Sequence, residues 1–228
     1  LLPAEYPSIS DVKFAAKYIP MDIVGGDFYD FIKINDNELG IFISDVSGHG
    51  VPAALITSMI KVAATSVNKT SLRRPSKFFE IINETLFDKT ATNFITAFYG
   101  IYNKENKTFK YSNAGHCAPI YYDSNDNTTH KMETDGIVLG AFEGVSFEEK
   151  KVQINSGDKI ILYTDGLVET MDFNRNQYGL RGLQDFIEKN NECPIGQLVH
   201  ELYNDVFEWM PSSSSFEDDI VIIGLDFK

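Results

Sequence analysis

Aspartates that stand beside glycines or at the ends of apolar runs are the residues of this sequence best suited to chemistry. A lone carboxylate buried at a strand end costs several kcal/mol unless it is paired or bound to metal. Neighbouring glycines let the backbone open for a hard cation, and ligands that are all oxygens suit Mg²⁺ or Mn²⁺. If the segments converge, they predict a divalent-cation site. The segments are "VGGDFYD" (24–30), "IFISDVSGHG" (41–50), "IILYTDG" (160–166) and "FEDDIVIIGLD" (216–226), with Asp27, Asp30, Asp45, Asp165, Asp218 and Asp219.

Each segment also has an ordinary structural interpretation. An aspartate beside a glycine is most often a turn or cap residue, so "TDG" or "DD" alone carries little weight. The joint pattern of four segments favours a site. Two histidines stay open: His49 could lie in a loop or at a helix N-terminus, and His116 in "NAGHCAP" could simply hydrogen-bond a turn.

Short strands must position these acids. "NDN" (35–37), "NKENK" (103–107) and "DSNDN" (123–127) are typical of hairpin connections, which predicts antiparallel pairing. Runs rich in β-branched and aromatic residues predict the strands. They lie at 11–19, 28–34, 39–46, 94–102, 107–113, 117–123, 146–154, 158–163 and 219–226.

Three helices are predicted between and after these strands. One follows Gly50, and the second follows Pro75, a good first-turn residue. The third follows Pro194. Grouped strands and helices indicate one α+β domain over residues 1–228 with antiparallel sheets, and "PSSSS" (211–215) reads as a mobile loop. The expected helical stripes are Leu55, Met59, Val62 and Ser66; Phe79, Ile82 and Leu86; and Ile195, Leu198, Val199, Leu202, Val206 and Trp209.

Composition excludes several classes of function. A chain of 228 residues with 43% hydrophobic content can bury a core, but a net charge of −13 would repel nucleic acid and anionic membranes. No run is long enough to span a bilayer and no signal peptide is visible, so a cytoplasmic location is expected. Cys117 and Cys193 lack metal-type spacing and read as ordinary thiols. Because the sequence lacks a starting Met, it is expected to be a fragment of a longer chain.

Six motifs in order resemble one family: "LLPAEYP", "AAKYIPMDIVGGDFYDF", "SDVSGHGVPAAL", "NAGHCAPIYY", "LYTDGLVET" and "DDIVIIGLD". The chain resembles the PP2C-type (PPM) metal-dependent serine/threonine phosphatases, in their bacterial branch of sporulation and stress-response regulators (SpoIIE/RsbU-like). The resemblance implies an αββα sandwich of two antiparallel sheets flanked by helix pairs. It also implies metal ligands at Asp27, Asp45, the Val46 carbonyl, Asp165 and Asp218. Asp30 and Asp219 would hold water or support the ligands, with Asp218 and Asp219 open to exchange of roles.

The resemblance implies a mechanism without a protein nucleophile. Two Mn²⁺ or Mg²⁺ ions about 4 Å apart activate a water against a phosphoester. Gly25 and Gly26 would let the chain turn tightly there, while the adjacent aromatic residues form core. The N-terminal stretch lacks the phosphate-binding arginine of larger relatives and offers only Lys13 and Lys17. His49 is a weak candidate for a general acid.

The same resemblance implies that the domain is the C-terminal effector part of a longer chain, and it also implies regulation and partners. The helices after Gly50 would couple an upstream sensor or partner to metal recruitment, and a homodimer through them is expected. The implied substrate is a phosphorylated regulatory protein of the anti-sigma-factor antagonist type. Two alternatives remain: a catalytically silent binding module, and a cyclic dinucleotide synthase, because "GGDF" (25–28) echoes the metal-binding turn of those nucleotide cyclases.

Overall fold

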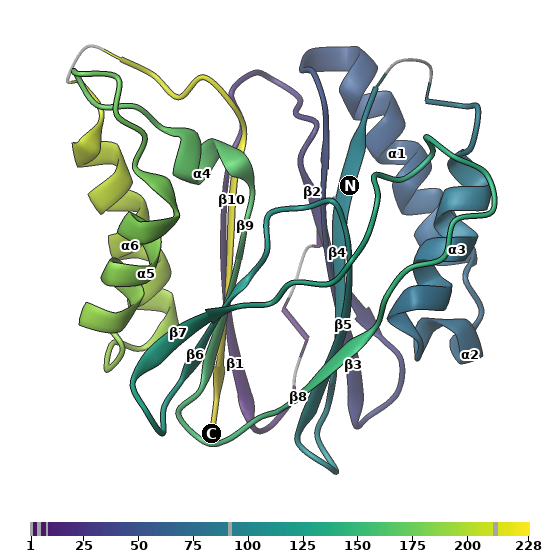
Figure 1. Ribbon diagram of the computed structural model, residues 1–228, viewed down its shortest axis with the longest axis horizontal. Coiled ribbons are helices and arrows are strands. Elements are labelled where there is room, and N and C mark those ends of the chain that lie inside the picture. Colours follow the sequence, from purple (N-terminus) through teal and green to yellow (C-terminus); the bar gives the residue numbers. More distant parts are fainter. Residues whose placement is uncertain (1, 4–5, 8, 91–92, 212–213) are drawn as a thin grey trace. The chain divides into compact units, whose positions relative to one another are not determined.

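The computed structural model contains two antiparallel five-stranded sheets and six helices in the described part of the chain (Figure 1). It describes residues 2–3, 6–7, 9–90, 93–211 and 214–228. The chain forms two compact units. Unit 1 consists mainly of Asp22–Ala118 and Glu133–Ile154, and unit 2 of Ser10–Met21, Pro119–Met132 and Asn155–Lys228. The predicted α+β class with two antiparallel sheets is confirmed.

Unit 1 contains the sheet with the order β2-β3-β4-β5-β8. Its hairpins form where the sequence predicted them. The Asn35 side chain accepts hydrogen bonds from the backbone N–H groups of Asn37 and Glu38 at 2.7 and 2.9 Å, and Asn103 similarly holds the next turn through Glu105. The strands are β2 (Phe28–Lys33), β3 (Glu38–Val46), β4 (Ile95–Asn103), β5 (Thr108–Ala114) and β8 (Lys150–Gln153).

Helices α1 (Gly50–Ser66), α2 (Lys69–Leu72) and α3 (Pro75–Leu86) belong to the same unit. Figure 1 shows α1 and α3 along one face of the sheet. The α3 stripe Phe79, Ile82 and Leu86 is buried as predicted. In α1 the predicted stripe is wrong: Leu55 and Val62 are 63% and 68% exposed. The buried α1 face instead consists of Ala53, Ile56, Thr57, Ile60, Ala63 and Ala64.

Small residues explain that error in α1. Ala53, Ala63 and Ala64 allow close approach of the helix to the sheet, where they contribute to the core with Phe42, Phe78 and Tyr99. The larger apolar side chains consequently point outward. Hydrophobicity alone favoured the wrong face because the fit to the sheet depends on side-chain size as well as on burial of apolar area.

Unit 2 contains the sheet with the order β1-β10-β9-β6-β7. Its strands are β1 (Val12–Ile19), β6 (Ile120–Asp123), β7 (Thr128–Lys131), β9 (Lys159–Tyr163) and β10 (Ile220–Phe227). Helices α5 (Gly179–Lys189) and α6 (Ile195–Trp209) lie on one face of this sheet (Figure 1), and α4 (Asp165–Glu169) follows β9. The predicted α6 stripe is buried except for Trp209, which is exposed.

Several elements differ from the sequence-based expectation. Strand β7 and helices α2, α4 and α5 were not predicted, because they are short or rich in polar residues and glycine. Strand β6 begins at Ile120 rather than at residue 117, since Pro119 has no N–H to donate. Strand β8 begins at Lys150 rather than at 146. The "PSSSS" prediction falls partly outside the described residues, at 212–213.

Across the described residues, each helix is too short or too polar to cross a lipid bilayer.

Candidate functional site

In unit 1, Asp27 and Asp45 lie at the same end of two paired strands. Phe28 of β2 pairs with Ser44 of β3 in antiparallel register. Asp27 precedes Phe28 and Asp45 follows Ser44, so the register brings the two acids to neighbouring positions. Strand alternation puts both on the face opposite Phe28 and Val46, whose side chains belong to the core beneath α1 and α3. Asp27 is only 5% exposed.

Gly26 brings the backbone before Asp27 against the end of β3. A Cβ atom at Gly26 would lie 2.5 Å from the Val46 carbonyl oxygen and 3.4 Å from the Ala53 Cβ. Only glycine fits there without a backbone shift. Thr57 of α1 donates a buried hydrogen bond to the Gly26 carbonyl at 2.9 Å. The segments that carry Asp27, Asp45 and Val46 are therefore packed together, with α1 against them.

The structure corrects the expectation for Asp30. Its pairing with Phe42 places it on the helix-covered face of β2, opposite to the face of Asp27. There the carboxylate bonds the Lys61 ammonium of α1 at 2.5 Å. Asp30 therefore links a strand to a helix instead of supporting the other acids directly.

In unit 2, a second glycine brings together the other two acidic segments. Asp165 is the first residue of α4, and Thr164 before it pairs with Val221 through bonds of 2.9 and 3.2 Å. A Cβ atom at Gly166 would lie 2.3 Å from the Asp219 carbonyl oxygen and 3.2 Å from the Asp218 Cβ. Asp165 thus lies at the segment Asp218–Asp219, which precedes β10.

Asp218 and Asp219 have different surroundings. Asp219 is buried, and its carboxylate accepts a hydrogen bond from the Met21 N–H at 2.7 Å, beyond the end of β1. Asp218 is exposed and accepts a hydrogen bond from the Asp219 N–H at 2.8 Å. Asp219 therefore fixes the backbone, whereas Asp218 presents its carboxylate at the surface of unit 2.

The electrostatics in unit 2 fit a bound cation. Burial, followed by the charge of nearby Glu169, raises the pKa of Asp165 above the usual range of a carboxyl. A divalent ion would offset both effects, because a positive charge favours the ionised form. The donor set is composed of oxygens, as Mg²⁺ and Mn²⁺ prefer. The residues present therefore fit divalent cations.

The two histidines left open by the sequence have structural positions. His116 is buried, its ring Nδ1 lies 2.8 Å from the Thr96 hydroxyl, and its backbone N–H donates to the Asn113 side-chain oxygen at 2.7 Å. His116 therefore hydrogen-bonds the turn in which it lies, which is one of the roles left open by the sequence. His49 is exposed at the N-cap position of α1.

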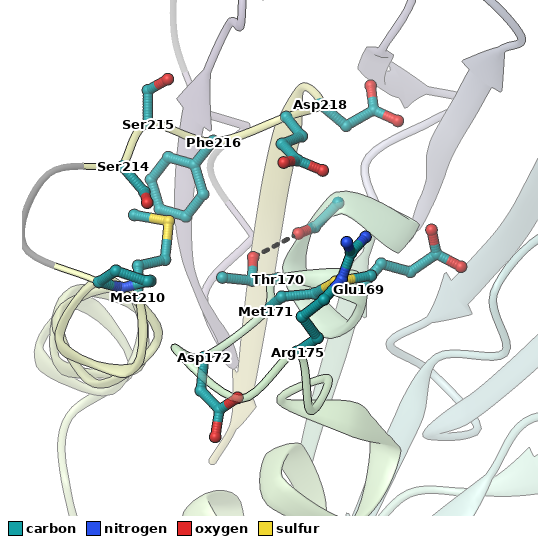
Figure 2. Close-up of a pocket in the computed structure, with 13 residues that line it drawn as sticks. Glu169, Thr170, Met171, Asp172, Arg175, Met210, Ser214, Ser215, Phe216 and Asp218 are labelled. Carbon is teal, nitrogen blue, oxygen red and sulfur yellow. Dashed lines mark hydrogen bonds between the residues drawn. The ribbon is translucent and has the colours of Figure 1, made fainter.

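Sequence reasoning missed a pocket of about 440 Å³ in unit 2 (Figure 2). It lies between α4 with its following segment and the loop that precedes β10. Arg175 could have been found as a basic residue ten positions after Asp165, but its position in the pocket depends on the fold. Lining residues include Gly166, Glu169, Arg175, Met210, Phe216 and Asp218.

A small acidic group on the β6–β7 hairpin was also not predicted. Asp123, Asp126 and His130 have ligand atoms within 4.8 Å of one another. Asp123 accepts a hydrogen bond from the Asn125 N–H, and Asp126 accepts one from the Thr128 hydroxyl at 2.6 Å. These carboxylates stabilise a turn, and we assign them no other role.

Comparison with known proteins places this chain among phosphatases. The family model described as Stage II sporulation protein E (SpoIIE) matches residues 35–228. The curated protein "Phosphoserine phosphatase RsbU" of Bacillus subtilis (strain 168) is 32% identical over 232 residues, which cover 100% of this chain and 67% of that protein.

Two solved structures show the same fold. The SiaA-PP2C domain of Pseudomonas aeruginosa matches with a TM-score of 0.82 at 18% identity, covering 94% of this chain and 86% of that domain. The catalytic domain of the serine/threonine protein phosphatase PstP, solved in complex with two manganese ions, matches with a TM-score of 0.66 at 12% identity. That match covers 95% of this chain and 98% of the PstP domain.

Proposed function

Because the chain belongs to the SpoIIE family, whose phosphatase domain is of the PP2C type, we propose that it is a metal-dependent protein serine/threonine phosphatase. One observation carries the proposal. In each unit, a glycine that cannot accept a side chain packs one acidic segment against another, Gly26 in unit 1 and Gly166 in unit 2. Both units together, residues 1–228, would form one catalytic domain.

We propose that two divalent cations, Mn²⁺ or Mg²⁺, are the cofactors. Their ligands would be Asp27, Asp45, the Val46 carbonyl, Asp165 and Asp218. Asp219, which the sequence left open to exchange roles with Asp218, would instead position Asp218 through the hydrogen bond from the Met21 N–H. When bound, such ions lower the pKa of water and neutralise phosphoryl charge. The two manganese ions of PstP support this choice of metal.

The other residues of the chain would then hold the metal-binding carboxylates in position. Strand register and the Gly26 contact hold Asp27 and Asp45 at neighbouring positions, so their carboxylates need little reorganisation. Thr170 donates a buried hydrogen bond to the Gly166 carbonyl at 2.7 Å, which fixes α4 behind Asp165. The proposed mechanism requires no nucleophilic side chain from the protein.

The proposed substrate is a phosphorylated regulatory protein of the anti-sigma-factor antagonist type. The name of the RsbU relative, a phosphoserine phosphatase, supports phosphoserine as the target group. We also propose a homodimer through the helices after Gly50. The outward face of α1, with exposed Val51, Leu55 and Val62, supports a partner at this helix. Analytical ultracentrifugation of Leu55→Asp protein would test it, since dimer retention would contradict the assignment.

Hydrolysis of p-nitrophenyl phosphate is the direct test of the activity. We expect turnover that depends on Mn²⁺ or Mg²⁺, is lost on chelation, and falls by at least about 100-fold in Asp45→Asn. The same variant should release no phosphate from phosphoserine protein. Asp36→Asn, an exposed aspartate of the β2–β3 turn, is the matched control.

Two outcomes would favour the alternatives. A folded protein that binds metal but turns over nothing would be the silent binding module. Cyclic dinucleotide formed from GTP would support the cyclase, although membership in the SpoIIE family argues against it.

A further inference from the structure

A short hairpin over residues 171–177, next to α4, is held by several hydrogen bonds. Met171 and Gln177 form an antiparallel bridge, and the Asp172 N–H donates to the Asn176 carbonyl at 2.9 Å. The Asp172 carboxylate accepts hydrogen bonds from the Asn174 and Asn176 N–H groups, both at 2.8 Å. The Asp172 side chain thus holds the turn together. These bonds give the backbone at the tip of the 171–177 hairpin a defined conformation.

Arg175 occupies a strained position on this hairpin. Its φ of 63° lies in the left-handed region, which costs a non-glycine residue on the order of 1 kcal/mol. Within the described residues its guanidinium has no ion-pair partner, although Arg73 and Arg181 pair with Glu38 and Asp185. A strained, unpaired arginine on a hydrogen-bonded turn is more consistent with binding than with stabilising the fold.

The side chain of Arg175 extends into the pocket that Glu169 and Asp218 also line (Figure 2). Of the charged side chains that line it, Arg175 is the only cation; the others are Glu169, Asp172, Glu217 and Asp218. In a chain of net charge −13, an anionic ligand entering here would meet one positive side chain. A guanidinium offers paired N–H donors that match phosphate oxygens.

From this geometry we propose that Arg175 binds the phosphoryl group of the substrate, beside the ligand Asp218. The inference rests on the proposed function, and it supplies the phosphate-binding arginine that the N-terminal stretch lacks. The 171–177 hairpin of unit 2 then places the Arg175 guanidinium where it can bind an anion, and no sequence motif predicts this position. Arg175 would contact the phosphate itself rather than residues flanking the phosphoserine.

Calorimetric titration with inorganic phosphate tests this directly in Mg²⁺-loaded protein. Arg175→Ala should raise the phosphate Kd about tenfold or more, because a charge-assisted pair is lost. Arg175→Lys should be intermediate, since an ammonium keeps the charge without the planar fork. In kinetics, phosphate should inhibit Arg175→Ala correspondingly less, and KM should rise for both p-nitrophenyl phosphate and a phosphoserine peptide.

Matched controls separate this role from general charge and from loop damage. Arg181→Ala removes the same charge from exposed α5, and Phe173→Ala alters the same hairpin at an 86% exposed side chain. Both should retain wild-type phosphate affinity. Unchanged phosphate affinity in folded Arg175→Ala would overturn the proposal, as would a KM effect confined to the phosphopeptide. Phosphate binding that needs Arg175 in a protein without hydrolytic activity would contradict the phosphatase assignment and still support the phosphate site.

Discussion

The Lys61 ammonium lies 2.5 Å from the Asp30 carboxylate, and this bond ties α1 to β2 three residues beyond Asp27. Thr57, one helical turn earlier on α1, bonds the Gly26 carbonyl just before Asp27. The two bonds flank Asp27 on either side. Because they come from successive turns of one helix face, the position of α1 and the backbone around Asp27 are coupled.

Lys61→Met should destabilise the protein by about 2 kcal/mol, because the Asp30 side chain is only 11% exposed and would lose its cation. Urea unfolding measures the change, and Asp30→Asn in the same background should recover part of it. Lys33→Met removes the partner of the exposed Asp36 and should leave stability unchanged. Equal effects of the two lysine variants would refute the buried ion pair.

Thr57→Val keeps the side-chain shape and removes the bond to Gly26. We expect a loss of about 1 kcal/mol in stability and a weaker affinity for Mn²⁺, because the segment before Asp27 is less firmly held. Metal titration by calorimetry gives the affinity. Thr65→Val, on the exposed part of the same helix, loses a bond to the Val62 carbonyl and should bind Mn²⁺ normally. Normal affinity in Thr57→Val would show that α1 does not position Asp27.

Gly166→Ala should weaken metal binding about tenfold and destabilise the fold by about 2 kcal/mol, because its Cβ would lie 2.3 Å from the Asp219 carbonyl oxygen. Calorimetric metal titration and urea unfolding report the two effects. Gly196→Ala in α6 meets no atom within 4 Å and should leave metal affinity intact while stabilising the protein slightly. A Gly166→Ala protein with unaltered metal affinity would disprove the role of this close contact.

Glu38 gives a pH-dependent prediction. Burial alone would raise the pKa of Glu38, but bonds from Arg73, Asn35 and Asn103 outweigh burial and hold that pKa below its usual value of about 4.5. A lowered pKa in the folded state contributes stability above pH 4.5 that is lost as the pH falls through the folded value. The stability difference between wild type and Glu38→Gln should therefore shrink below pH 4.5, as followed by urea unfolding. A difference that grows toward acid pH would reverse the assigned sign.

Much of the fold could be predicted because its signals are local. The Asn35 and Asn103 turns form from side-chain bonds to the next few N–H groups, and runs of β-branched and aromatic residues mark strands such as β3. Helix α4 escaped prediction because it has only five residues, and α5 because glycines and polar residues stand between its few apolar positions. In α1 the apolar residues identified the helix but not its buried face, since alanines fit the sheet and Leu55 does not.

The sequence by itself indicated which acids are candidates to hold a cation, because carboxylates beside glycines at strand ends are recognisable without coordinates. It also determined the family, through six motifs in order. Only the tertiary structure decided what each acid faces: Asp30 meets Lys61, Asp219 meets Met21, and Arg175 enters a pocket with Asp218. The physical reason is that strand register and the contacts between distant segments select a side chain's neighbours, and neither is encoded in the residues next to it in the chain.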